Sequence, residues 1–478
     1  RRISLLEKGL EVILDGTYER MLHYAHDLRS PITMLYMLGV ILPVLGLVVF
    51  PLMSCFLGGV VKWWHLSMVY NVILPVFVYF FGQELLAKRP GGYGSEDILE
   101  QYPEFDDYSK IDFFGIKINP LLPAVLIGGI IVLIGLLPII IFYVNGANYD
   151  FELFGYKFLD YKEFDDGYIG PYGLWSMLLS MFVPLGIAFG VGIYYYFFSK
   201  NLIRIRENTM KLEKEFSGAI FQIGNRVGDG IPVESAFSKV AENMKNSPAG
   251  DFLRIVAVNI QKLGMSVKEA IFNIQRGAIT YFPSNLIKSS MKVLVESAKK
   301  GPLVVSKSLI TISDYVNRVD KIAERLKDLL ADIISSMKSQ ISFLTPMIAA
   351  IVVGVTSMMI NIINKLGELF KEFEAGNVET ETINTGLLKI LGEGGLNIEN
   401  IIPGYQFQVV VGLFVVEMAL ILTILSSDIE NGFDPVTKKN RIAKNLFVSA
   451  FLYFVIALIG ILVFSVLASG VATFAMPT

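Results

Sequence analysis

Apolar runs long enough to cross a membrane recur seven times along the chain. A helix needs about 20 apolar residues to cross the hydrocarbon core of a bilayer. The runs lie at about 31–57, 66–82, 121–144, 171–198, 342–363, 405–425 and 446–474. The pattern therefore predicts an all-α, polytopic membrane protein. A composition that is 53% apolar and a mean hydropathy of +0.55 agree with that class.

Polar segments between these runs divide the chain into four parts. The first alternates charged and apolar residues at helical spacing and predicts one amphipathic helix. The third is a polar domain with 22 Lys and Arg against 14 Asp and Glu. The four parts are 1–32, 33–198 with spans 1–4 and polar segments 83–118 and 145–170, 199–340, and 341–478 with spans 5–7 and an acidic segment 365–404.

The distribution of Lys and Arg near the span ends sets the orientation. The segment 434–445 reads as a short basic loop, and Lys327 and Lys338 precede the fifth span on the same side. We therefore place that side, the polar domain and the loop 83–118 in the cytoplasm. The segments 145–170, which could form a small hairpin, and 365–404 then lie outside. The N-terminus is predicted inside and the C-terminus outside the cell membrane.

The polar domain 199–340 predicts a bundle of up-and-down helices, because short breaks separate helical segments of similar length. The residues expected to end or begin helices are Gly228, Gly230, Pro232, Ser247, Gly264, Ser266 with Glu269, Ser284 and Gly301. Gly228 and Gly230 follow the last turn of the first helix, where a residue with positive φ is expected. After the last break a long amphipathic helix runs without Gly or Pro from Leu303 to Gln340 and leads into the fifth span. Each Gly and Pro, taken alone, is adequately explained as a residue that ends or begins a helix.

Taken as a set, these breaks resemble the type II secretion system F family of platform proteins, which serve secretion systems, type IV pili and the archaellum. The matching motifs are Gly-x-Pro-hydrophobic-x-x-Ala-Phe from Gly230 to Phe237 and Leu-Gly-x-Ser-hydrophobic-x-x-Ala from Leu263 to Ala270, followed by Gly301 before the long helix. The match covers about 215–363. Seven spans resemble the archaeal branch, with pilus and archaellum both open.

The resemblance also bears on the N-terminal part. Family members often carry two cytoplasmic domains, so residues 1–32 resemble the last helix of a truncated first copy. Both copies then have a charged helix, a proline and an apolar span. Aligned on Pro31 and Pro346, however, their residues match poorly.

No motif for catalysis, metal binding or a cofactor stands out. The sequence holds no G-x-x-x-x-G-K-[ST], so we expect no ATP hydrolysis and no enzymatic activity by this chain. Cys55 is the single cysteine, which excludes an intramolecular disulfide. His23 and His26 lie one turn apart beside Asp27, but a solvated helix face explains them better than a metal site does.

Glu417 is the one ionisable residue near the middle of a predicted span. A carboxyl at that depth is costly and usually faces protein or water, which makes it a candidate functional residue. The equally weighted alternative is a protonated or hydrogen-bonded carboxyl that serves packing alone. A specific functional version is contact with the N-terminus of an incoming pilin.

The positive charge of the polar domain has two explanations. It can reflect the positive-inside rule together with attraction to anionic lipids. It can also dock a partner, which the resemblance names as a hexameric secretion-type ATPase. The candidate docking residues are Arg226 and Asp229 near the hairpin tip, and Lys438, Lys439, Arg441 and Lys444. Nucleic acid is disfavoured, because exposed aromatics do not alternate with the basic residues.

The leading functional hypothesis is therefore a non-enzymatic platform that couples this ATPase to the insertion of pilin or archaellin subunits into a filament, alone or as a homo-oligomer. The alternative is a transporter or channel. That alternative predicts broken helices in pairs and several midplane charges, whereas only Glu417 qualifies. A retinal protein is disfavoured because the seventh span has no lysine.

Overall fold

The computed structural model describes residues 2–56, 62–88, 110–113, 116–146, 149–153, 156–164, 167–374, 401–432 and 434–475. Within these residues the chain is largely helical, and seven helical stretches are long and apolar enough to cross a membrane. The predictions of a helical fold and of seven helices able to span a membrane are thereby confirmed. The predicted segment 365–404 lies mostly outside the described residues.

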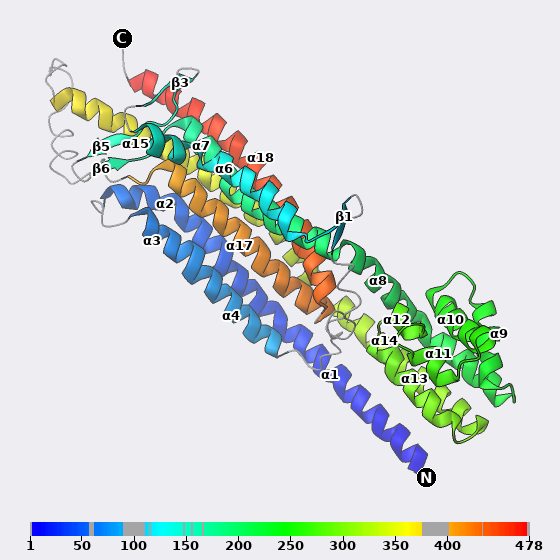
Figure 1. Cartoon of the computed structure of the whole chain (residues 1–478). Helices are drawn as coiled ribbons and strands as arrows, with labels where there is room; N and C mark the ends of the chain where they lie inside the picture. The colour runs from blue at the N-terminus through cyan, green and yellow to red at the C-terminus, as the bar shows by residue number, and fades with distance from the viewer. Residues whose placement is uncertain are drawn as a thin grey trace.

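The long helices form an elongated membrane bundle with a smaller polar bundle at one end (Figure 1). The helices of the membrane bundle are α1 Arg2–Tyr36, α2 Leu42–Phe56, α3 Trp63–Met68, α4 Leu74–Ala87, α6 Leu121–Asn145, α7 Leu174–Ser180, α8 Phe182–Gly228, α14 Pro302–Ser339, α15 Thr345–Glu374, α17 Gly404–Asn431 and α18 Pro435–Ala475. Short π-helical segments join some of them, namely η1 Met37–Ile41, η2 Val69–Ile73 and η4 Gln340–Leu344.

Short antiparallel hairpins occupy the two polar segments that precede the fourth span. The hairpin β1–β2 pairs Ile111–Phe113 with Ile116–Ile118. The predicted hairpin at 145–170 is present as two, β3–β4 (Glu152–Leu153 with Tyr156–Lys157) and β5–β6 (Lys162–Phe164 with Gly167–Ile169). The fold is therefore not purely helical, although the strands are very short.

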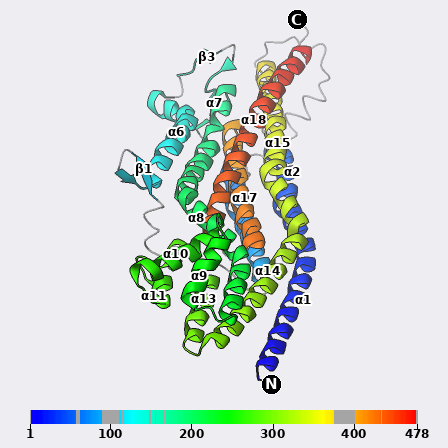
Figure 2. The ribbon, with the colours of Figure 1, turned by 90° about the vertical axis from the view of Figure 1, so that its right-hand side faces the viewer.

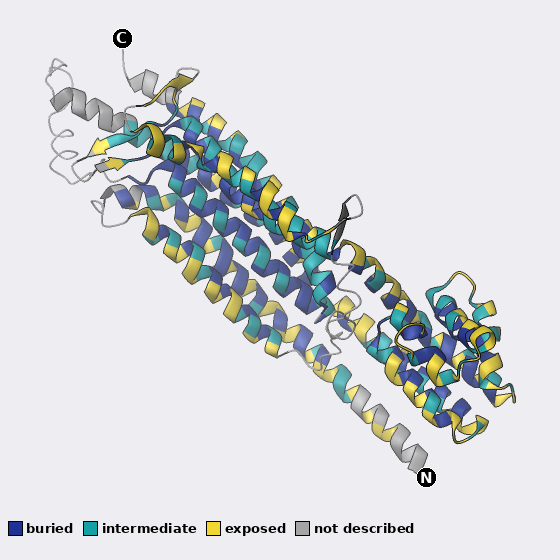
Figure 3. Ribbon diagram, viewed as in Figure 1, coloured by how far each residue is buried: buried dark blue, intermediate teal, exposed yellow. Residues whose placement is uncertain are grey.

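Helix α17 is the centre of the membrane bundle, as its burial shows in Figure 3. It packs against α4, α7, α8, α14, α15 and α18. Around it, glycines bring neighbouring helices together: Gly128 of α6 faces Gly186 and Gly190 of α8, and Gly354 of α15 faces Gly460 of α18. Small residues at such crossings allow close backbone approach, which drives helix association where lipid removes the hydrophobic effect.

The polar bundle has its own apolar core between the ends of α8 and α14. Its short helices are α9 Val233–Asn243, α10 Pro248–Leu263, α11 Val267–Phe272, α12 Ala278–Tyr281 and α13 Asn285–Ala298. Their lengths are unequal, and α12 was not predicted, so the premise of similar helix lengths is wrong. The predicted caps hold: the side chains of Ser247, Ser266 and Ser284 each accept a hydrogen bond from the first turn of a helix.

Three of the predicted glycine breaks have the backbone conformation that favours glycine. Gly230, Gly264 and Gly301 have φ of 86°, 64° and 100°. Gly228 does not, and its interpretation as a residue of positive φ is wrong. It is the exposed last residue of α8, and a Cβ there would lie 2.7 Å from the Ser306 hydroxyl of α14, which can rotate away.

Two helices connect the polar bundle to the membrane bundle without a break. The fourth span and the first bundle helix, predicted as separate, are one 47-residue helix, α8. The predicted long helix continues as α14, η4 and α15 into the fifth span. The two helices are joined at their crossing, where the hydroxyls of Ser217 and Ser313 each donate to the other residue's carbonyl, at 3.1 and 2.9 Å.

Each of the three π segments is followed by one α-helical residue and then by a proline. The pairs are Leu42-Pro43 after η1, Leu74-Pro75 after η2 and Thr345-Pro346 after η4. In each, the amide before the proline donates to the carbonyl five residues back. A proline cannot donate to the carbonyl four residues back and its ring clashes there. The wider π turn relieves this conflict while the helix continues.

The two helix pairs α1–η1–α2 and α14–η4–α15 run side by side in the same direction (Figures 1 and 2). The helix α1 continues through Pro31, so that proline does not separate the charged helix from the first apolar run. In the helices α1–η1–α2, Pro43 occupies the position that Pro346 has in α14–η4–α15. Each proline is the second residue after its π segment.

Candidate functional site

The turn between α17 and α18 brings together residues from both helices that link the two bundles. Arg206 of α8 donates through Nε to Oδ2 of Asp434 at 2.9 Å, across 228 residues of sequence. Only 9% of Arg206 and 3% of Asp434 is exposed. Asp434 also caps α18, accepting hydrogen bonds from the amide and hydroxyl of Thr437. One buried carboxylate therefore fixes α8 to the first turn of α18.

The same turn holds α14 through a second ion pair. Lys338, at the end of α14, lies 2.8 Å from the Glu430 carboxylate near the end of α17. Arg441 of α18 binds both oxygens of that carboxylate. Lys438 pairs with Asp428 at 2.6 Å. We call Arg206, Lys338, Asp428, Glu430, Asp434, Lys438 and Arg441 the turn network.

Two carboxylates of α8 carry the contacts onward into the polar bundle. Glu213 accepts a hydrogen bond from Ser284, the residue that caps α13, and lies 3.8 Å from Arg206. Glu215 accepts a hydrogen bond from the backbone amide of Ala249 in the first turn of α10. A carboxylate at a helix N-terminus satisfies free amides and is favoured by the helix dipole. The short helices are thus attached to α8 itself.

Asp320 of α14 lies close enough to Glu213 of α8 for the two charges to interact. Burial, together with the negative charges of Glu213 and Glu324 and opposed by Lys214, raises the pKa of Asp320 to about 6. Desolvation and like charges both disfavour the ionised form. Asp320 therefore keeps its proton to higher pH than an exposed aspartate does.

The basic segment 434–445 is not the free loop that the sequence predicts. Residues from Pro435 onward are the first turns of α18, and the seventh span is continuous with them. Three of the four candidate docking cations there have partners within the chain. Lys438 and Arg441 form the ion pairs above, and Lys439 lies 4.0 Å from the Phe198 ring centre. Lys444 is exposed to solvent.

The other candidate docking residues lie at the far tip of the polar bundle. Asp229 and Gly230 are exposed between α8 and α9, beside half-buried Arg226. Phe198, which contacts Lys439, and Arg226 are about 40 Å apart along α8 at 1.5 Å per residue. The structure therefore does not bring the two predicted docking places together.

Glu417 lies near the middle of α17, as predicted for a midspan residue. The side chain is half-buried, and its Oε2 atom is buried without a hydrogen-bond partner. Gln408, fully buried toward the other end of the same helix, also has unpartnered amide atoms. The turn network thus connects to a membrane helix that carries an unsatisfied carboxyl.

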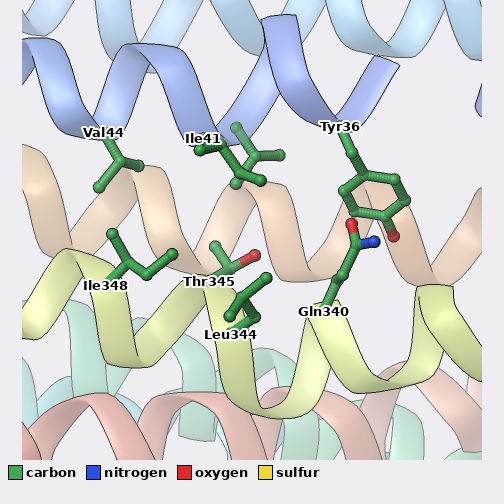
Figure 4. Close-up of a pocket in the computed structure, with 8 residues that line it drawn as sticks. Tyr36, Ile41, Val44, Gln340, Leu344, Thr345 and Ile348 are labelled. Atoms are coloured by element: carbon green, nitrogen blue, oxygen red, sulfur yellow. The ribbon is translucent and has the colours of Figure 1, made fainter. Parts of the chain in front are cut away.

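The two π segments η1 and η4 meet across a small cavity of about 10 Å³. Its walls are Tyr36, Val40, Ile41, Val44, Gln340, Leu344, Thr345 and Ile348. Figure 4 shows Tyr36 beside Gln340 and Val44 facing Ile348 across the two helices. The cavity is about the size of one water molecule, so it is a packing defect at the π turns rather than a ligand site.

Sequence reasoning missed most of the turn network. One signal was available: Arg206 follows Leu202 and precedes Thr209 and Leu212 on the buried side of α8, where a charge needs a partner. The identity of that partner, 228 residues away, had no local signal. Among described residues no three His, Cys, Asp or Glu side chains are placed to bind a metal ion, and His23, His26 and Asp27 are exposed on α1.

No family model, curated protein or solved structure matches this chain.

Proposed function

We propose that this protein is a non-enzymatic membrane platform of a type IV pilus-like machine, of the archaeal pilus or archaellum type. It couples a cytoplasmic hexameric secretion-type ATPase to the insertion of pilin or archaellin subunits into a filament. The polar bundle receives the movement of the ATPase, and the membrane bundle passes it to the subunits. The motifs from Gly230 to Ala270 are the basis for naming this family.

The observation that best supports the proposal is the pair of unbroken helices between the two bundles. Both α8 and α14 run from the polar core to the α17–α18 turn, where Arg206 and Lys338 each meet a buried carboxylate. A displacement of the polar bundle along either helix therefore reaches α17, the central membrane helix. Transmission of this kind needs stiff helices and fixed attachments, and both are present.

Softening α8 between the two bundles tests the proposal. Glu207 and Lys211 are exposed on α8, and a double substitution by glycine costs about 1 kcal/mol of helix stability per site relative to alanine. In the native host, the double glycine variant should still co-purify with the ATPase but assemble few filaments, counted by electron microscopy. The double alanine variant should assemble normally.

Normal filament numbers in the double glycine variant would refute transmission through α8. The alternative of a transporter or channel predicts solute or ion flux through the purified protein in liposomes. Flux at a rate that depends on Glu417, with no loss of filaments in Glu417→Gln, would favour that alternative.

A further inference from the structure

A groove of about 710 Å³ lies on the outer surface of α18 in the membrane bundle. The helix α18 packs against both α8 and α15, and Figure 2 shows it between them. The volume falls within the range of about 300–1,000 Å³ that is usual for ligand sites. We call this feature the α18 groove; its residues are Phe189 of α8, Ser342 and Phe343 of η4, and Phe447, Val448, Phe451 and Leu452 of α18.

The α18 groove is apolar apart from one serine hydroxyl. The rings of Phe189 and Phe447 pack edge to face with their centres 5.2 Å apart. Phe343, Val448 and Phe451 keep 50%, 51% and 60% of their surface exposed. Apolar surface is unfavourable in water by about 25 cal/mol per Å², whereas contact with hydrocarbon carries no such cost. Because all three helices belong to stretches able to span a membrane, the acyl chain of a membrane lipid is the occupant that fits.

A lysine lies at the end of the α18 groove that is nearest the polar bundle. Lys444 precedes Phe447, Val448 and Phe451 by three, four and seven residues, so the four side chains share one face of α18. Lys444 is exposed and makes no ion pair or hydrogen bond with the described part of the chain. A lysine near the end of a span extends its amine toward the lipid headgroups. Lys444 therefore presents its charge to the headgroup of a lipid whose chain lies in the groove.

The α14 side of the groove brings more positive charge to the same level. The helices α15 and α18 run in the same direction (Figure 1). Lys338 and Lys444 each lie 16 residues before the two glycines at which these helices meet. The Lys338 ammonium is 2.8 Å from the Glu430 carboxylate, but that carboxylate also binds Arg441. Two cations thus share one anion, and Lys444 adds a third positive charge.

We propose that the α18 groove binds an anionic phospholipid, with an acyl chain between Phe189 and Phe343 and the phosphate at Lys444. Clusters of basic residues at the end of membrane helices attract anionic headgroups. A zwitterionic headgroup carries its own cation beside the phosphate and gains less from the lysine. The bound lipid contacts α8 and η4, which belong to the two helical connections between the bundles. The proposal does not rest on the proposed function.

Photoreactive lipids test the proposal with the full-length protein. The protein is reconstituted in phosphatidylcholine liposomes with a trace of phosphatidylglycerol or phosphatidylcholine that carries a diazirine in one acyl chain. Mass spectrometry then measures labelling of the peptides that hold Phe343 and Phe451. Phosphatidylglycerol should label them about fivefold more, which corresponds to about 1 kcal/mol for one lysine near an anionic headgroup. Lys444→Gln should reduce this preference to less than half of its wild-type value.

The matched control is Lys88→Gln, because Lys88 is an exposed lysine at the end of α4, away from the groove. This variant should keep the wild-type preference. The peptide that holds Phe80, a residue of α4 with 66% of its surface exposed, reports labelling outside the groove and should show no such preference. Equal labelling of the groove by the two lipids, a preference that survives Lys444→Gln, or an equal loss in Lys88→Gln would overturn the proposal.

A second variant tests the acyl chain separately from the headgroup. Val448→Trp fills the α18 groove with a larger side chain at an exposed position. It should reduce labelling of the Phe343 peptide by phosphatidylglycerol at least threefold and leave labelling of the Phe80 peptide unchanged. Unchanged labelling of both peptides would show that the chain does not lie in the groove. Unaltered helical content by circular dichroism shows that each variant is folded.

Discussion

The buried pair of Arg206 and Asp434 offers the sharpest test of how the two bundles are joined. Asp434→Asn keeps the shape of the side chain and its cap on α18, because asparagine is an equally good N-cap residue. It removes the negative charge and leaves Arg206 buried. The substitution therefore isolates the ion pair from the cap.

The cost follows from the burial of both partners. Removing one member of a buried ion pair typically destabilises a protein by about 3–5 kcal/mol, since the remaining charge stays buried. Glu213 lies 3.8 Å from Arg206 and offsets part of this loss. We expect Asp434→Asn to lower the free energy of unfolding by about 2–3 kcal/mol. Arg206→Met combined with Asp434→Asn should recover most of it.

The measurement is reversible unfolding in detergent micelles by SDS titration, for both single variants and the double variant. The control is Asp251→Asn, because Asp251 and Arg254 form a comparable but exposed pair at 2.7 Å. Exposed pairs contribute less than about 1 kcal/mol. If Asp434→Asn costs no more than this control, the pair does not hold α8 to α18 and the transmission argument loses its main support.

Three further predictions follow from individual contacts. Gly228→Leu should lower the free energy of unfolding of the full chain by no more than about 1 kcal/mol, because the one atom within 3.0 Å of a Cβ there is the Ser306 hydroxyl, which can rotate away. A loss of more than about 2 kcal/mol would refute this reading of the contact. Asp320→Asn should leave the melting temperature near pH 4 unchanged and raise it at pH 7. The pKa of Asp320 in the folded protein, about 6, is higher than the ordinary value of 3.8. The stability of the wild-type protein therefore falls as the pH rises between these two values, by about 1 kcal/mol after solvent screening. Equal melting temperatures of wild type and Asp320→Asn at pH 7 would contradict this prediction. Pro346→Ala permits a regular α-helical hydrogen bond and should remove the π turn η4. Distances between spin labels at the ends of α14 and α15 should then change. Unchanged distances would show that tertiary packing, and not the proline, sets the π turn.

Local features were readable from sequence because their physics is local. The seven spans follow from the length and apolarity of each run. The caps at Ser247 and Ser266 and the positive φ of Gly264 depend only on a few neighbouring residues. The same local rules erred at Gly228, which is the last residue of α8, whereas the positive φ falls two residues later at Gly230.

The tertiary structure alone decided which of these local elements act together. Whether a helix continues through residue 198 into the polar bundle, as α8 does, depends on packing at both of its ends. The partners of Arg206 and Lys338 are far away in sequence, and no spacing rule identifies them. The sequence by itself determined that Glu417 lies within a span. Only the packing of the helices around α17 determined that Glu417 is half-buried, because burial is a property of the neighbours and not of the residue.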